Sequence, residues 1–205
     1  MRRFAGMLAD HGPVRGLIGP RELPRLWSRH LLNCAAVARM LPDDGVLVDV
    51  GSGGGLPGIV LAAMRPGMDV VLVETMERRV TWLEEVVDAL GLRNVRVLRG
   101  RAEELHEGVR ADVVTARAVA PLDRLAGWTL PFLRPGGRLL AMKGRTAAEE
   151  LAGARAALEA YGGGAAQILS VDVVPGIEPT TVVSVVRESE RMPAKPVRKK
   201  GRRRR

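Results

Sequence analysis

The chain has 205 residues, 46% hydrophobic and 27% charged, a composition typical of a globular domain that buries its own core. Aromatic residues make up only 3%, which argues against an aromatic stacking platform as the main device for binding nucleic acid. The single cysteine excludes an internal disulfide, and the three histidines stand too far apart for a zinc site, so we expect no bound metal.

No run of about 18 apolar residues is present, and the first residues lack the apolar core of a secretory signal. We therefore expect neither a membrane span nor secretion. The lone Cys34 fits a reducing compartment, which predicts a cytoplasmic protein.

The net charge of +9 is concentrated at one end of the chain. Residues 191–205 hold nine of the 32 basic residues and no acid, so the first 190 residues balance 23 basic against 23 acidic groups. Such a tail is expected to be disordered and to attract polyanions. The alternative is a solvated end without a role.

Residues 1–45 are expected to be helical and to pack on the domain that follows. One apolar face recurs there at helical spacings of four and three, which places both Trp27 and Cys34 in the core, with the thiol inert. The residues of this face are Trp27, Leu31, Cys34, Ala38 and Leu41. The sequence Pro-Asp-Asp-Gly at 42–45 then ends the segment.

From residue 46 to residue 161 short apolar runs alternate with helical patterns. Strands are predicted at 46–50, 69–74, 95–98, 112–116 and 138–142, and helices at 57–64, 80–90, 121–133 and 146–161. This alternation indicates an α/β fold whose mainly parallel sheet is covered on both faces. Two further strands, at 167–174 and 180–187, are joined by a short link and must pair antiparallel. We therefore divide the chain into an N-terminal helical segment (1–45), an α/β domain (46–190) and a basic tail (191–205).

A glycine-rich turn follows the first strand, where the backbone must turn tightly and let a ligand approach. Two registers compete. Residues 53–58 match the dinucleotide pattern G-x-G-x-x-G, but they place Pro57 where a helix should offer N–H donors to a pyrophosphate. The other register begins with Asp49 and continues through Gly51 and Gly53, the form found in methyltransferases. A turn without any ligand is the remaining alternative.

An acid, Glu74, ends the second strand. A carboxylate there can accept hydrogen bonds from both hydroxyls of a ribose, as in NAD enzymes and methyltransferases alike. Glu74 thus indicates an adenosine-containing cofactor without identifying it. The alternative is a solvated strand end.

The match extends well beyond the loop, over residues 1–187. The segments that carry this match are 26–33, 51–59, 78–84, 100–104, 115–122 and 143–144. With them the chain resembles the bacterial RsmG (GidB) family, which has a class I, Rossmann-like methyltransferase fold closed by an antiparallel C-terminal hairpin.

The resemblance implies methylation of N7 of a guanosine in the 530 loop of 16S rRNA, at position 527, with S-adenosylmethionine as methyl donor. It places the cofactor contacts on Gly51, Leu56, Glu74, Thr75, Met76, Ala102, Glu103 and Arg117, to which the loop pattern adds Asp49 and Gly53. The family often has Asp where this chain has Glu74. The tail lies outside the family core.

Three of these positions have alternatives from the residues alone. Ala102 and Glu103 could read the adenine, or could simply be the first turn of a helix with its acid facing the dipole. Arg117 interrupts an apolar run and needs a partner: the methionyl carboxylate, an RNA phosphate or a surface acid. Trp82 is expected in the core, and His30 is expected to be a packed or surface residue rather than a catalyst.

Guanine N7 carries an exposed lone pair and needs no deprotonation, so the reaction asks for alignment rather than for a general base. No catalytic residue is predicted. Two rival functions remain at this point, a nicotinamide-dependent oxidoreductase that uses the shifted glycine register and a non-catalytic RNA-binding protein. We expect a monomer.

Overall fold

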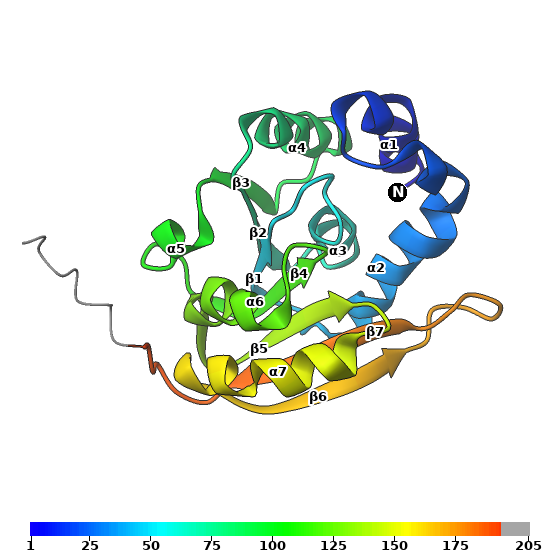
Figure 1. The fold of residues 1–205 in the computed structure, drawn as a ribbon. Coiled ribbons are helices and arrows are strands. Elements are labelled where there is room, and N and C mark those ends of the chain that lie inside the picture. Colours follow the sequence, from blue (N-terminus) through cyan, green and yellow to red (C-terminus); the bar gives the residue numbers. More distant parts are fainter. Residues whose placement is uncertain (194–205) are drawn as a thin grey trace, which may run out of the picture.

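The computed structural model describes residues 1–193, and the expected basic tail lies outside the described residues from residue 194 on (Figure 1). Seven strands form one sheet, in the order β3-β2-β1-β4-β5-β7-β6. The strands are β1 (Gly45–Val50), β2 (Met68–Glu74), β3 (Val95–Arg99), β4 (Ala111–Arg117), β5 (Leu133–Lys143), β6 (Gly163–Val171) and β7 (Thr180–Arg187).

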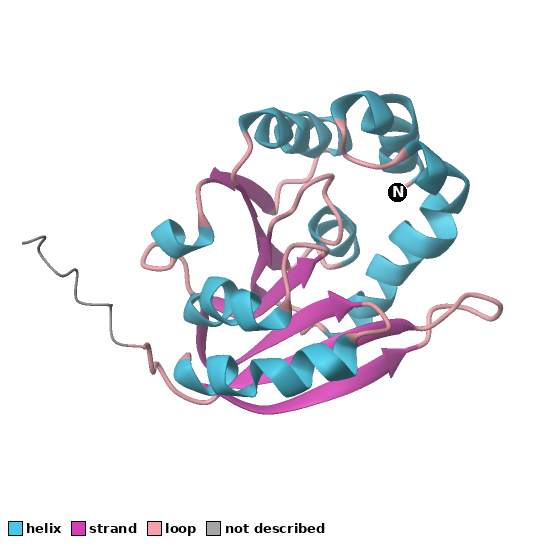
Figure 2. Ribbon diagram, viewed as in Figure 1, coloured by secondary structure: helices cyan, strands magenta, loops and turns pink. Residues whose placement is uncertain are grey.

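Helices alternate with these strands, as Figure 2 shows. The α-helices are α1 (Arg2–Arg15), α2 (Leu32–Val37), α3 (Gly58–Met64), α4 (Glu77–Leu90), α5 (Ala102–Leu105), α6 (Leu122–Thr129) and α7 (Ala147–Ala160). The order of elements predicted from the periodicity is confirmed. Boundaries differ, because β5 begins at Leu133 and the sixth strand begins at Gly163 rather than at 167.

Strands β1 to β5 are parallel, whereas β7 runs antiparallel to both of its neighbours, β5 and β6. The predicted antiparallel pairing of the last two strands is confirmed, and β7 lies between β5 and β6. The strand order reverses between β1 and β4. Ligands of open α/β sheets bind outside the carboxyl ends of the strands at such a reversal, which is where the glycine loop begins.

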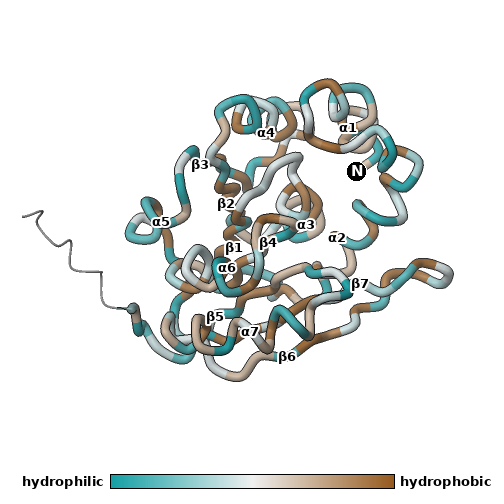
Figure 3. Tube along the Cα trace, viewed as in Figure 1, coloured by the Kyte–Doolittle hydropathy of each residue, from teal (hydrophilic) through white to brown (hydrophobic). Residues whose placement is uncertain are grey.

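The sheet separates two hydrophobic clusters, because successive side chains of a strand point to opposite faces. Leu47 and Leu72 pack with the N-terminal segment, α3 and α4, while the neighbouring Val48 and Val73 pack with α5, α6 and α7. The central strands are accordingly largely brown in the hydropathy view of Figure 3. One cluster thus joins the first 45 residues to the sheet.

The segment after α1 departs from the predicted regular helix. A 3-10 helix (Pro20–Arg25) leads into a π-helix (Leu26–Leu31), followed by α2 and a 3-10 turn (Ala38–Met40). The expectation that Trp27 packs in the core is wrong, since the residue is 45% exposed. The other four residues of the predicted face, Leu31, Cys34, Ala38 and Leu41, are buried as expected. Trp27 was placed with them on the assumption of 3.6 residues per turn, and the wider π-turn brings Leu26 to the core in its place.

Residues 1–193 contain neither a membrane-spanning helix nor a cluster of metal-binding side chains. None of the helices there is both long and apolar enough to cross a membrane. Nor do three or more His, Cys, Asp or Glu side chains gather there in a way that could hold a metal ion.

Candidate cofactor site

The glycine loop between β1 and α3 continues the pairing of β1 with β2. The N–H groups of Gly51 and Ser52 both donate to the carbonyl oxygen of Val73, at 2.9 and 3.1 Å. Gly51 and Gly53 adopt φ values of 72° and 53°, a conformation that residues with a side chain rarely take. A Cβ on Gly51 would stand 2.7 Å from Cγ2 of Val119, which belongs to the turn after β4. Two turns from neighbouring strands therefore meet at Gly51.

The buried Trp82 of α4 contacts the glycine loop directly. Its indole Nε1–H donates to the carbonyl oxygen of Gly54 at 3.1 Å, and its ring is fully buried, as predicted. The predicted contact residue Leu56 is partly buried and packs against the hydrophobic cluster that contains Trp82, α3 and the N-terminal segment.

Glu74 organises the edge of the site. The side chain is only 4% exposed. Its Oε2 accepts the Gly53 N–H at 3.0 Å, and its Oε1 accepts the N–H groups of Thr75 and Met76 at 2.8 and 2.9 Å. The Thr75 hydroxyl adds a further bond at 3.2 Å. The structure thus brings four predicted contact residues, Gly53, Glu74, Thr75 and Met76, into one hydrogen-bonded group.

Asp49 lies under the loop rather than at its surface, since it is 1% exposed. Oδ1 accepts the Thr115 hydroxyl at 2.9 Å, and Oδ2 accepts the Gly58 N–H at 3.1 Å. The carboxylate therefore ties β1, β4 and the start of α3 together. Burial raises the pKa of Asp49 to about 6, against the hydrogen bonds from Thr115 and Gly58, which lower it.

The raised pKa of Asp49 predicts an unusual pH dependence of stability. Because the folded-state pKa lies above the ordinary value of 3.8, the ionised form is the costly one. The stabilisation is present below about pH 4 and is lost as the pH rises through about 6. Relative to Asp49→Asn, we expect the wild type to lose on the order of 2–3 kcal/mol of unfolding free energy over this interval. Urea denaturation of both proteins at several pH values measures this, and a pH-independent difference would contradict it.

The start of α3 distinguishes the two registers of the glycine loop. In the dinucleotide register the first turn of α3 must offer N–H donors to a pyrophosphate. Pro57 caps α3 and has no N–H, while the N–H of Gly58 is already bonded to Asp49. The geometry therefore favours the register that begins at Asp49.

Ala102 and Glu103 begin α5 at the carboxyl end of β3, beside Glu74. The N–H of Gly100 donates to the carbonyl oxygen of Glu74 at 3.1 Å, which fixes the turn against β2. It is Glu104 whose carboxylate accepts the Arg101 N–H, at 3.4 Å, in a capping interaction. Glu103 stays exposed at this edge, and Ala102 is buried.

Arg117 ends β4 on the other side of the loop. Its Nη1 donates to Sγ of Cys34 at 3.2 Å, and its Nη2 contacts Nδ1 of His30. Burial raises the pKa of the Cys34 thiol to about 11, which agrees with the inert cysteine expected. Within residues 1–193 no carboxylate forms an ion pair with Arg117. The surface-acid alternative is therefore not realised there.

Sequence reasoning missed the network that reaches Arg117 from the N-terminal segment. Glu22 and His30 stand 95 and 87 positions before Arg117, so no local pattern signals the contact. It also missed Lys143, whose Nζ donates to Ala120 O and to Glu150 Oε2, both at 2.7 Å. These bonds fasten the turn after β4 to β5 and α7.

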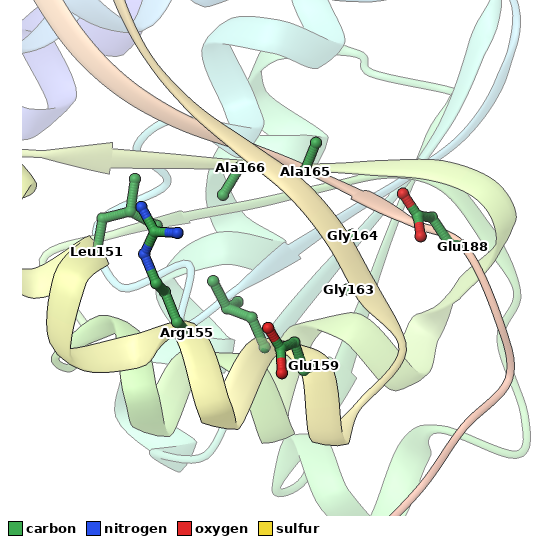
Figure 4. Close-up of a pocket in the computed structure, with 9 residues that line it drawn as sticks. Leu151, Arg155, Glu159, Gly163, Gly164, Ala165, Ala166 and Glu188 are labelled. Atoms are coloured by element: carbon green, nitrogen blue, oxygen red, sulfur yellow. The ribbon is translucent and has the colours of Figure 1, made fainter.

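The residues present fit an adenosine cofactor with an amino-acid arm. Gly51 and Gly53 form the tight turn of the loop, Glu74 supplies a carboxylate, and the Arg117 guanidinium forms no ion pair with a carboxylate among the described residues. By contrast, a cavity of about 380 Å³ between α7 and β6 lies at the opposite, amino end of the parallel strands (Figure 4). Arg155, Glu159 and Glu188 lie along it, far from the loop.

Known proteins match this chain along most of its length. The family model GidB, described as rRNA small subunit methyltransferase G, matches residues 1–173. Proteins named ribosomal RNA small subunit methyltransferase G from Nocardioides sp. and Thermobifida fusca are 55% and 54% identical over 184 residues. The alignments cover 90% of this chain and 74% and 78% of those proteins.

Solved structures share the fold at low identity. An S-adenosylmethionine-dependent O-methyltransferase from Thermotoga maritima aligns with a TM-score of 0.61 at 17% identity, over 77% of this chain and 65% of its own. A precorrin-6y C5,15-methyltransferase from Geobacter metallireducens gives 0.57 at 18% identity, over 84% and 91%. The strand order and these likenesses define a class I methyltransferase fold. The chain belongs to the GidB family, and its methyl donor is S-adenosylmethionine.

Proposed function

We propose that this chain transfers a methyl group from S-adenosylmethionine to N7 of a guanosine in the 530 loop of 16S rRNA, at position 527. The family match over residues 1–173 carries the proposal, because relatives that are more than half identical over 184 aligned residues bear the name of a small-subunit rRNA methyltransferase. The atom and the nucleotide rest on the resemblance of the motifs.

We assign the two ends of the cofactor to opposite sides of the glycine loop. Glu74 accepts from the ribose, supported by Thr75 and Met76, and the tight turn at Gly51 and Gly53, with Leu56 after it, borders the cofactor. Ala102 and Glu103 recognise the adenine, and Arg117 binds the methionyl carboxylate. The hydrogen bonds that join Gly53, Thr75 and Met76 to Glu74 support this division. Asp49 acts as a positioning residue beneath the loop.

The reaction requires the protein to align guanine N7 with the methyl group of the donor. When bound, the cofactor supplies a methyl group on a positively charged sulfur. N7 attacks without losing a proton, so the protein holds donor and base in line, which is worth roughly 7–11 kcal/mol. The turn after β4, fastened by Lys143 and Glu150, borders the loop at Gly51 and is suited to hold that alignment.

A reaction without a general base has a flat pH profile. At saturating cofactor and RNA, we expect the single-turnover rate to show no ionisation of a protein group between about pH 6 and pH 9. Rapid-quench measurement of methyl transfer across this range tests the prediction. A rise with a pKa near 7 that one pocket substitution removes would show that a base takes part.

The basic residues 191–205 are proposed to tether the RNA electrostatically without selecting the base. Each phosphate neutralised on single-stranded RNA contributes about −0.7 to the slope of log affinity against log salt. If half of the nine charges engage, deletion from Arg191 should flatten the slope by roughly 3. Filter binding at several salt concentrations measures the slope. An unchanged slope would leave the tail as a solvated end, and a changed methylation site would give it a role in specificity.

The cytoplasm is the proposed compartment, since ribosomal subunits are made there. We propose that a monomer acts.

A further inference from the structure

The N-terminal segment reaches the proposed cofactor site through two side chains. His30, in the π-helix, contacts the guanidinium of Arg117 at the end of β4 through Nδ1. Its other ring nitrogen, Nε2, stands 2.9 Å from Oε2 of Glu22, which lies in the preceding 3-10 helix. The contact with Arg117 spans 87 positions of the chain, whereas Glu22 and His30 belong to consecutive helices of the N-terminal segment.

The roles of donor and acceptor in this chain of contacts follow from chemistry. A guanidinium only donates, so Nδ1 of His30 must be the unprotonated nitrogen that accepts from Arg117. The proton of the neutral imidazole then sits on Nε2 and donates to Glu22. Burial, followed by the nearby Arg117 charge, lowers the pKa of His30, which agrees with a neutral ring. Glu22 therefore fixes the tautomer that Arg117 needs.

The contacts with Cys34 and His30 hold the Arg117 side chain in place without neutralising its positive charge. Of the five N–H groups of a guanidinium, the contacts to Cys34 and His30 use two, which leaves three. Neither His30 nor the Cys34 thiol is an anion, and within residues 1–193 no carboxylate forms an ion pair with Arg117. The buried Asp49 feels the charge of Arg117, which lowers the Asp49 pKa, but Asp49 does not contact the guanidinium. A guanidinium held in this way keeps its charge and a pair of donors for an incoming carboxylate, which it would bind by two parallel hydrogen bonds.

We propose that Glu22 and His30 are positioning residues that orient Arg117 toward the carboxylate of the methyl donor, so that the N-terminal segment completes the cofactor site. This inference rests on the carboxylate-binding role proposed for Arg117. The π-helix contributes to this arrangement. It carries His30 to Arg117 while Leu26 and Leu31, one π-turn apart, both pack in the core.

The test compares two ligands that differ in the carboxylate. S-adenosylhomocysteine has the amino-acid arm, whereas 5′-methylthioadenosine lacks it. We expect His30→Ala to weaken S-adenosylhomocysteine about tenfold, as when a charge-assisted hydrogen bond is impaired, and to change binding of 5′-methylthioadenosine less than about twofold. Arg117→Ala should show the same selectivity, and the double variant should lose little more than Arg117→Ala alone, because the residues act as a unit.

Three variants complete the experiment. His30→Asn places an acceptor near the position of Nδ1 and should restore most of the affinity. Glu22→Ala, at a partly exposed site, should reproduce a smaller selective loss and guards against misfolding of the His30 variant. Arg29→Ala is the matched control, because Arg29 pairs with Glu22 at 3.6 Å but is not among the contacts of Arg117. It should leave both affinities unchanged.

Each other outcome overturns the inference. An equal loss for both ligands would mean that His30 only supports the fold, and no loss for either would remove its role. If Arg117→Ala and His30→Ala weaken RNA binding but neither nucleoside, Arg117 holds a phosphate instead. Isothermal titration and RNA filter binding separate these cases. The methyl transfer proposed above is tested independently by mapping the methylated nucleotide, so the two can fail separately.

Discussion

Gly51→Ala is expected to abolish measurable S-adenosylmethionine binding, or to weaken it by more than about tenfold, which corresponds to 1.4 kcal/mol. Two physical effects act together. The alanine must adopt the left-handed φ of 72°, and its Cβ would stand 2.7 Å from Val119 Cγ2. The loop therefore has to move away from the turn after β4, and the larger Gly51→Val should be at least as severe. Calorimetric titration of the cofactor measures the loss.

Two variants make this prediction specific. Gly91→Ala has nearly the same φ, 63°, but nothing lies within 4 Å of its new Cβ, so it should cost some stability and leave binding intact. Adding Val119→Ala to Gly51→Ala removes the clashing methyl groups and leaves Cβ of residue 119 at 3.5 Å, so part of the affinity should return. Full affinity in Gly51→Ala would show that the cofactor does not depend on this approach.

Glu74→Ala should weaken cofactor binding by about 1–3 kcal/mol, the range for loss of a charged hydrogen-bond acceptor. The variant loses the proposed ribose contact and also the four hydrogen bonds that join the carboxylate to Gly53, Thr75 and Met76. Glu74→Gln keeps one acceptor oxygen and the shape of the side chain, so its loss should be intermediate. Titration with S-adenosylmethionine and, in parallel, with NAD measures both affinities.

The control for Glu74 is Glu77→Ala. Glu77 is a nearby acid at the start of α4, but it is exposed and pairs with Arg99 at 3.1 Å on the surface. Removing it should leave cofactor affinity unchanged. Equal losses in both variants would mean that only the net charge near the site matters, and tight NAD binding without S-adenosylmethionine binding would contradict the assigned cofactor.

Much of the fold follows from local periodicity. The apolar runs that end at Asp49-Val50 and Glu74 predicted buried parallel strands, and their alternate residues do face two separate clusters. The glycine loop was also readable, because the φ values of Gly51 and Gly53 are ones that other residues avoid. Patterns within about 18 residues thus predicted the sheet and one edge of the site.

Contacts between distant segments could not be predicted in this way. Asp49 was expected beside the cofactor, yet its carboxylate meets Thr115, 66 positions later, beneath the loop. Trp27 was placed in the core because the spacing assumed an α-helix, while tertiary packing of Leu26 and Leu31 selects a π-turn. The same turn brings His30 to Arg117, a contact that no periodicity of the chain encodes.

Mapping the methylated nucleotide shows whether this chain methylates N7 of the proposed guanosine. The purified full chain is incubated with labelled S-adenosylmethionine and small ribosomal subunits whose 16S rRNA lacks the modification, and the RNA is then cleaved chemically at N7-methylguanosine. We expect a single labelled guanosine in the 530 loop, at position 527, and at limiting S-adenosylmethionine at least about tenfold less label with Gly51→Ala. Label on another atom or nucleotide, or RNA binding without any methyl transfer, would contradict it.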